Sequence, residues 1–148
     1  MKHKRDSKGK FIKVGVIVWT IDPENKMSFL IRHNRPYGGH DDEWTILFGN
    51  VETNETEEKA ALRELQEEFG ILKIENIKDL SYEIEFVDKQ GLTIIKFFAI
   101  KTENIDTKIT LNKESIGYDW MTIQRVKKIM QHDDEKKAFD ILVKNKYT

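Results

Sequence analysis

Residues 63–70, with the sequence RELQEEFG, place three carboxylates within five positions of a predicted helix. Glu64, Glu67 and Glu68 stand at i, i+3 and i+4, and they share one face because an α-helix turns about 100° per residue. Like charges at these spacings repel one another. No lysine follows any of the three at i+4, so the helix itself offers little to offset the repulsion on this acidic face.

The surrounding residues predict that the helix spans residues 57–69. Thr56 is a suitable N-cap, and Gly70 is a suitable terminator because glycine readily adopts the left-handed conformation of a helix end. Acidic residues in the first turn suit the positive end of the helix dipole. A core-facing stripe is predicted beside the acidic face, formed by Ala61, Leu62, Leu65 and Phe69.

Outside this helix the sequence alternates between strand and turn signals. β-branched and aromatic runs bounded by turn residues predict strands at 11–20, 27–33, 44–48, 80–88 and 92–100, with a short one at 108–111. Residues 49–55 are predicted as a loop, and 122–146 carry apolar residues at spacings that predict one or two helices. Strands then a helix, followed by strands then helices, indicate an α/β or α+β fold with a mixed sheet.

Composition restricts the class of protein. A chain of 148 residues with 39% hydrophobic and 34% charged residues is expected to form one globular domain, here residues 11–148. Residues 1–10 form a basic tail, which we expect to be a frayed terminus rather than a nucleic-acid arm because no aromatic residues interleave its charges. The absence of cysteine fits the reducing cytoplasm. No segment has the roughly 20 apolar residues of a membrane span.

Two hypotheses explain the acidic face. Most glutamate-rich helix surfaces are simply solvated, and glutamate is a good helix former. Alternatively, a bound divalent cation would turn the mutual repulsion into attraction, and carboxylate oxygens are preferred ligands of Mg²⁺ and Mn²⁺. Such an ion serves phosphate chemistry because it neutralises charge on phosphoryl oxygens and acidifies bound water.

A longer motif distinguishes these hypotheses. Gly49 is followed by Glu55 and then by the quoted octet, and the whole string 49–71, GNVETNETEEKAALRELQEEFGI, resembles the Nudix box at every defining position. The resemblance implies an α/β/α sandwich with a mixed β-sheet, the box helix on one side and the C-terminal helices on the other. It also implies Mg²⁺ or Mn²⁺ as cofactor and hydrolysis of a nucleoside diphosphate linked to another group.

The resemblance assigns roles within the box. The implied metal ligands are Glu64, Glu67 and Glu68, with the backbone carbonyl of Gly49 as a further ligand. Glu67 and Glu64 are also the implied catalytic carboxylates. Arg63 is implied to hold a glutamate in position, which a guanidinium can do by gripping a carboxylate at two points.

The flanking segments resemble one branch of the family. Residues 109–130, ITLNKESIGYDWMTIQRVKKIM, and the segment entering the box at Trp44 resemble dinucleoside tetraphosphate hydrolases. The resemblance implies that Glu114 is an additional metal ligand or the general base, and that Tyr118 and Trp120 are structural or line the pocket. Phe48 stands where those hydrolases often have lysine.

Four further side chains are candidate substrate-binding residues together with Trp44. Phe86, or its neighbour Tyr82, is placed to stack on a base, although strand aromatics more often fill the core. Tyr37 and His40 lie in the loop 34–43, where they would stack or contact phosphate, or else belong to a plain surface loop.

The resemblance implies a metal-dependent hydrolase in which water attacks phosphorus of a nucleotide polyphosphate, with diadenosine tetraphosphate as the preferred candidate. The alternatives are a nucleoside triphosphate or RNA 5'-triphosphate pyrophosphohydrolase, or a non-catalytic nucleotide-binding module. The net charge of -1 predicts no stable nucleic-acid partner. A membrane partner is not expected, and a homodimer is left open.

Overall fold

The computed structural model describes residues 2–36 and 43–145. These residues form a seven-stranded sheet in the order β3-β2-β1-β6-β5, with β4 paired to β1 and β7 paired to β2. The pairing of β1 with β6 is parallel and the other pairings are antiparallel, so the sheet is mixed. The strands are β1 (Phe11–Ile21), β2 (Met27–Asn34), β3 (Glu43–Thr45), β4 (Leu47–Asn50), β5 (Asn76–Asp88), β6 (Gly91–Lys101) and β7 (Ser115–Met121).

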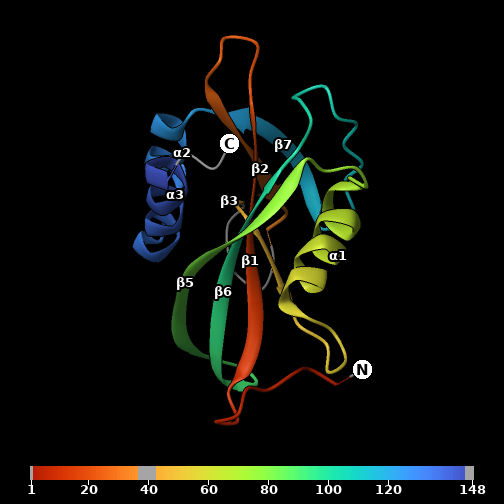
Figure 1. Ribbon diagram of the computed structural model, residues 1–148, viewed down its shortest axis with the longest axis vertical. Coiled ribbons are helices and arrows are strands. Elements are labelled where there is room, and N and C mark those ends of the chain that lie inside the picture. The colour runs from red at the N-terminus through yellow and green to blue at the C-terminus, as the bar shows by residue number, and fades with distance from the viewer. Residues whose placement is uncertain (1, 37–42, 146–148) are drawn as a thin grey trace.

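Helices cover both faces of the sheet. Helix α1 (Glu57–Phe69) lies on one face, and α2 (Ile123–Ile129) and α3 (Asp133–Asn145) lie on the other (Figure 1). No helix of the described residues is long and apolar enough to cross a membrane. The expected α/β/α sandwich is confirmed.

Strand β1 supplies both cores because successive side chains of a strand point to opposite faces. Val16 and Val18 join the core beneath α1, where they cluster with Leu65. Ile17 and Trp19 join the core on the other face with apolar residues of α2 and α3. The nearly continuous apolar run of β1 is therefore explained by burial on both sides.

Helix α1 begins and ends where the sequence predicts. The Thr56 hydroxyl accepts a hydrogen bond from the Lys59 amide at 3.1 Å, and Gly70 adopts the left-handed conformation with φ of 66°. The predicted stripe faces the core: Ala61, Leu65 and Phe69 are buried, and the half-buried Leu62 packs against the same cluster. Ala60 is fully buried in addition to the other three.

The strand predicted at 44–48 is in fact two short strands. β3 pairs with β2, whereas β4 pairs with β1, and the chain changes partner at Ile46. The predicted loop at 49–55 was also too long at its start, because Gly49 and Asn50 continue β4. Propensity alone does not reveal which neighbour a strand will pair with.

The short strand predicted at 108–111 is wrong, because this segment is irregular. The strand after β6 is instead β7, which pairs along β2. Its sequence SIGYDWM contains a glycine and an aspartate, residues that are depleted in strands, so its pairing is imposed by the fold. The region at 122–146, predicted to hold one or two helices, contains two.

The basic tail is ordered, contrary to the expectation of fraying. The Lys4 amide donates to the Val51 carbonyl at 2.7 Å, and the Thr53 amide donates to the Lys2 carbonyl at 3.0 Å. The Lys4 ammonium also donates to the Glu55 carbonyl at 3.1 Å. The tail therefore covers the loop that leads into α1, and its main chain satisfies polar groups of that loop.

Candidate active site

Arg63, in the middle of α1, joins this helix to the loop before it. Its Nε and Nη2 donate to the two carboxylate oxygens of Glu55 at 2.8 and 3.0 Å, and Nη2 also donates to the Asn50 carbonyl at 2.7 Å. Nη1 donates to Glu64 Oε1 at 3.0 Å. The two-point grip on a glutamate is therefore present, and it lowers the pKa of the Glu55 carboxyl. Whether Arg63 also takes part in catalysis stays a prediction.

Glu64 is buried against the glycine that opens the box. A Cβ atom on Gly49 would lie 2.1 Å from the Glu64 carboxylate, so only glycine leaves room for this side chain. Burial raises the pKa of Glu64 to about 7, with the charges of Glu67 and Glu68 adding to the rise and Arg63 opposing it. The close approach explains why the chain has no side chain at position 49.

Glu68 is also buried, and its partners lie outside the box. Arg32 Nη1 of β2 donates to Glu68 Oε2 at 2.5 Å, and Asn112 Nδ2 donates to the same oxygen at 2.7 Å. Sequence reasoning missed both partners. Arg32 gave one usable signal, since it is a charged residue that directly follows the apolar run FLI of a predicted strand. Asn112 gave none.

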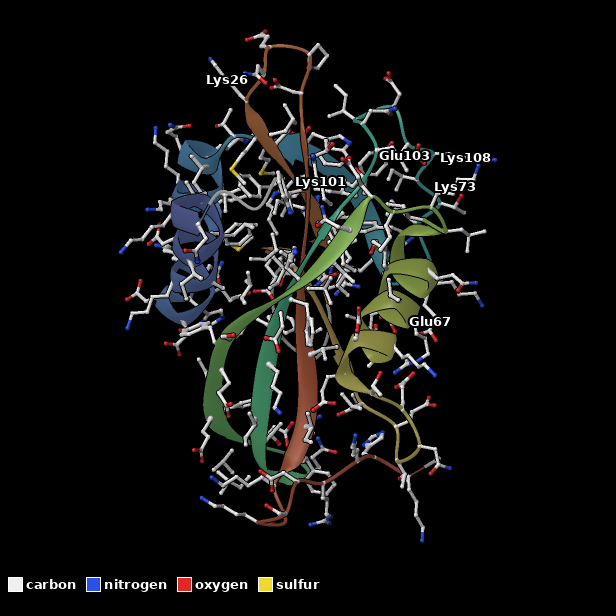
Figure 2. All side chains as sticks on the ribbon, viewed as in Figure 1. Lys26, Glu67, Lys73, Lys101, Glu103 and Lys108 are labelled. Atoms are coloured by element: carbon white, nitrogen blue, oxygen red, sulfur yellow. The ribbon has the colours of Figure 1, made fainter. Side chains whose placement is uncertain are left out.

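Glu67 and Glu114 are exposed to solvent. Glu67 lies on α1 (Figure 2), and 53% of its side chain is accessible, with Arg63 Nη1 3.4 Å away. The Glu114 amide donates to Asn112 Oδ1 at 3.0 Å. Asn112 also contacts Glu68, so the backbone of Glu114 is connected to the acidic face through the Asn112 side chain. The metal and catalytic roles of both glutamates stay predictions.

The acidic face offers the right donors for a divalent cation but in a closed arrangement. Among the described residues, no three His, Cys, Asp or Glu side chains converge closely enough to hold a metal ion. Glu64 and Glu68 each turn toward an arginine, Arg63 and Arg32 respectively. The all-oxygen donor set fits Mg²⁺ or Mn²⁺. The carboxylates would have to rotate away from the two guanidinium groups to share an ion.

An aromatic cavity of about 470 Å³ is linked to the acidic face by Arg32, which lines the cavity and contacts Glu68. Its walls include Trp44, Phe48 and Phe86 from three different strands, and Arg32 also lines it. The Trp44 ring stacks on His33 with 4.3 Å between centroids, and Lys13 Nζ lies 5.9 Å from the centre of the Phe86 ring. Two of the predicted substrate-binding residues, Trp44 and Phe86, are therefore brought together.

The other predicted substrate-binding residues are not at this cavity in the described chain. Tyr82 does not line it, because its ring packs against Phe97 at 5.3 Å and its hydroxyl donates to the Asp134 carbonyl at 3.1 Å. Tyr37 and His40 lie outside the described residues. Tyr118 is exposed, and Trp120 packs against the core beneath α1.

Sequence reasoning also missed polar residues of the aromatic cavity. Lys13 comes from β1, and its charge in the middle of an apolar strand was an available signal. Glu135 comes from the first turn of α3, and burial raises the pKa of its carboxyl. Nothing in its local sequence distinguishes it from the other acidic residues of that turn.

The NUDIX domain family model matches residues 12–142 of the chain. The chain belongs to the Nudix family. Two curated Nudix relatives, the asymmetrical bis(5'-nucleosyl)-tetraphosphatases of Sus scrofa and Rattus norvegicus, are 27% and 26% identical to it over 95 residues. The match covers 63% of this chain and spans only 65% of the length of each relative.

Solved structures have the same Nudix fold. A binary complex of C. elegans Ap4A hydrolase aligns with a TM-score of 0.74 at 22% identity, covering 89% of this chain and 94% of that one. The E. coli dihydroneopterin triphosphate pyrophosphohydrolase aligns with a TM-score of 0.71 at 18% identity, covering 97% and 99% of the two chains. At these identities the likeness concerns the fold alone.

Proposed function

We propose that this Nudix chain is a pyrophosphohydrolase that depends on a divalent cation and cleaves a phosphoanhydride in a nucleotide polyphosphate. The preferred candidate substrate is a dinucleoside polyphosphate such as diadenosine tetraphosphate. Support for this branch comes from the tetraphosphatases among its relatives and from the resemblance of residues 109–130.

One observation carries the proposal. Arg32 contacts Glu68 of the acidic face and also lines the aromatic cavity. We infer that a nucleotide whose base enters the cavity would bring its phosphates towards Arg32 and the carboxylates of α1. Base stacking on Trp44 or Phe86 requires only a π face, so it suits any nucleobase. In this proposal the site for the base and the site for the cation are therefore adjacent.

The proposed chemistry divides the work among the residues of the chain. When bound, a divalent cation supplies charge neutralisation on the phosphoryl oxygens and makes a nearby water more acidic. Glu64, Glu67, Glu68 and Gly49 would hold it, with Glu114 as a further ligand. The water oxygen bonds to phosphorus, the bridging P–O bond breaks, and a carboxylate accepts the water proton. Glu67 and Glu114 are the exposed candidates for that acceptor.

The roles of Arg63 and Arg32 follow from their contacts. Arg63 fixes Glu55 and the carbonyl of Asn50, so it keeps the box loop at a set distance from α1. Arg32, from β2, neutralises the charge of the Glu68 carboxylate. Arg63 acts as a positioning residue, and Arg32 is placed to exchange its carboxylate partner for phosphate.

The test is a substrate panel with purified protein in Mg²⁺ or Mn²⁺. Diadenosine tetraphosphate, nucleoside triphosphates and a triphosphorylated RNA are incubated separately, and the products are resolved by anion-exchange chromatography. Two nucleotides from diadenosine tetraphosphate support the preferred candidate. A mononucleotide with pyrophosphate from a triphosphate supports the alternative substrate class.

The Glu67→Gln variant tests the assignment of the site. We expect kcat to fall by about 10²- to 10⁴-fold, the range for loss of a general acid or base, while the melting temperature is unchanged. Glu103→Gln, an exposed glutamate outside the site, is the matched control (Figure 2). Turnover by Glu67→Gln at the wild-type rate would reject the assignment, and nucleotide binding without any turnover would favour a non-catalytic module.

A further inference from the structure

Arg32 and Asn34 lie between the aromatic cavity and a second hollow. Both residues line the cavity, and both also line a groove of about 490 Å³ on their other side. The remaining walls of this cationic groove are Arg35, Pro36, Lys113 and Glu114. Arg32 is already paired with Glu68, so Arg35 and Lys113 stand against Glu114 and the groove keeps a net positive charge that favours an anion.

Buried polar atoms without partners gather at the same place. Within the described residues, Arg32 Nε, Asn34 Oδ1 and Ser115 Oγ are buried and have no hydrogen-bond partner. Asn34 and Ser115 face each other across the pairing of β2 with β7. Because buried polar groups are normally hydrogen-bonded, such a cluster needs an explanation. A ligand that brings its own acceptors would satisfy the Arg32 N–H, because Arg32 lines the groove.

The groove is built from segments that are tied together. The Arg35 amide donates to the Glu114 carbonyl at 3.0 Å, and Arg35 Nε donates to the Lys113 carbonyl at 2.7 Å. These bonds fix the end of β2 to the segment that follows Asn112. The same segment reaches the acidic face, because Asn112 donates to Glu68. The cationic groove therefore has a set position relative to both the acidic face and the aromatic cavity.

We propose that the cationic groove binds the distal part of the substrate's phosphate chain, an inference that rests on the proposed hydrolase function. The binding groups are Arg32, Arg35 and Lys113, which all carry hydrogen-bond donors. A chain that starts from a nucleoside in the aromatic cavity passes the acidic face and then enters the groove. Substrates with longer phosphate chains present more anionic groups to the groove. The groove thus selects for long phosphate chains.

The test measures binding of inorganic tripolyphosphate by titration calorimetry, with EDTA present so that no metal contributes. We expect the wild type to bind tripolyphosphate, and Lys113→Gln to weaken that affinity roughly fivefold, the size expected for one exposed ion pair. Arg35→Gln removes a similar charge, but it also loses the bond to the Lys113 carbonyl. Lys113→Gln is therefore the cleaner variant, since in the described chain the contact of Lys113 is made by its carbonyl and not by its ammonium.

The matched control is Lys108→Gln, an exposed lysine of the same connecting segment that lies outside the groove (Figure 2). We expect it to bind tripolyphosphate as the wild type does. Equal affinities in Lys113→Gln, Lys108→Gln and wild type would overturn the inference, as would absence of tripolyphosphate binding by the wild type. These outcomes leave the proposed function intact if the wild type still hydrolyses diadenosine tetraphosphate in Mg²⁺.

A second arm identifies the source of the phosphate chain. Diadenosine tetraphosphate is titrated in the same metal-free buffer as tripolyphosphate. Tighter binding of the dinucleotide, lost in part by Lys113→Gln, supports a nucleotide whose phosphates enter the groove. Tighter binding of tripolyphosphate would overturn the nucleotide assignment and indicate a site for inorganic polyphosphate.

Discussion

The acidic face of α1 and the aromatic cavity are neighbours, yet they are built in opposite ways. The acidic face belongs to one helix, and its geometry is set by charged hydrogen bonds. The single side chain of Arg63 contacts Glu55, Glu64 and the Asn50 carbonyl. The aromatic cavity draws its walls from several strands and from α3. The difference indicates that the first region tolerates little displacement, whereas the second depends on shape and surface area.

Gly49→Ala, beside the acidic face, is expected to lower kcat more than a change in the aromatic cavity. The added Cβ would lie 2.1 Å from the Glu64 carboxylate, so the carboxylate must move away from its position beside β4. Misplacing a catalytic group by about 1 Å can cost roughly 100-fold, and we expect kcat to fall by about that factor. Overpacking should also lower the free energy of unfolding by about 1 to 3 kcal/mol. Steady-state kinetics and urea denaturation measure the two effects.

Gly117→Ala is the control for that change. A Cβ on Gly117 would meet only His33 Cβ at an ordinary 3.9 Å, and its backbone is not left-handed. We expect its kcat to match the wild type. If Gly49→Ala behaved like Gly117→Ala, the tight fit between β4 and Glu64 would have no part in function.

A smaller effect is expected in the aromatic cavity. Phe86→Ala removes one wall, and since base stacking on an aromatic contributes about 1 to 3 kcal/mol, we expect KM to rise roughly 5- to 100-fold with little change in kcat. Tyr82→Phe, which removes only the hydroxyl that contacts the Asp134 carbonyl, should leave KM unchanged. A rise in KM for Tyr82→Phe with none for Phe86→Ala would exchange the roles of the two residues.

The two regions also differ in how far the sequence predicts them. The span of α1, its Thr56 cap and its Gly70 terminator follow from local rules, and the carboxylates share a face because helical spacing fixes it. That Arg63 holds a glutamate was implied by the family resemblance, and the structure identifies this glutamate as Glu55. The acidic face is thus encoded within one contiguous segment of 23 residues.

Contacts between distant segments were beyond local rules. Arg32 and Asn112 are 36 and 44 residues from Glu68, and they meet it only because β2 and the segment before β7 lie beside α1. The wrong strand at 108–111 and the missed β7 have the same origin, since pairing with β2 decides which residues become a strand. The order of the tail was not predicted because it depends on hydrogen bonds to backbone groups of the box loop. Backbone groups are the same for nearly every residue type, so amino-acid composition does not reveal such partners.

The most direct measurement is the affinity of the acidic face for a cation, obtained by titrating Mn²⁺ and following its electron paramagnetic resonance signal. We expect the wild type and the Glu103→Gln control to bind Mn²⁺ alike. Glu64→Gln and Glu67→Gln should bind it on the order of 10- to 100-fold more weakly, since each removes a charged oxygen donor. Equal Mn²⁺ affinity in all four proteins would contradict the claim that the clustered carboxylates of α1 hold a divalent cation.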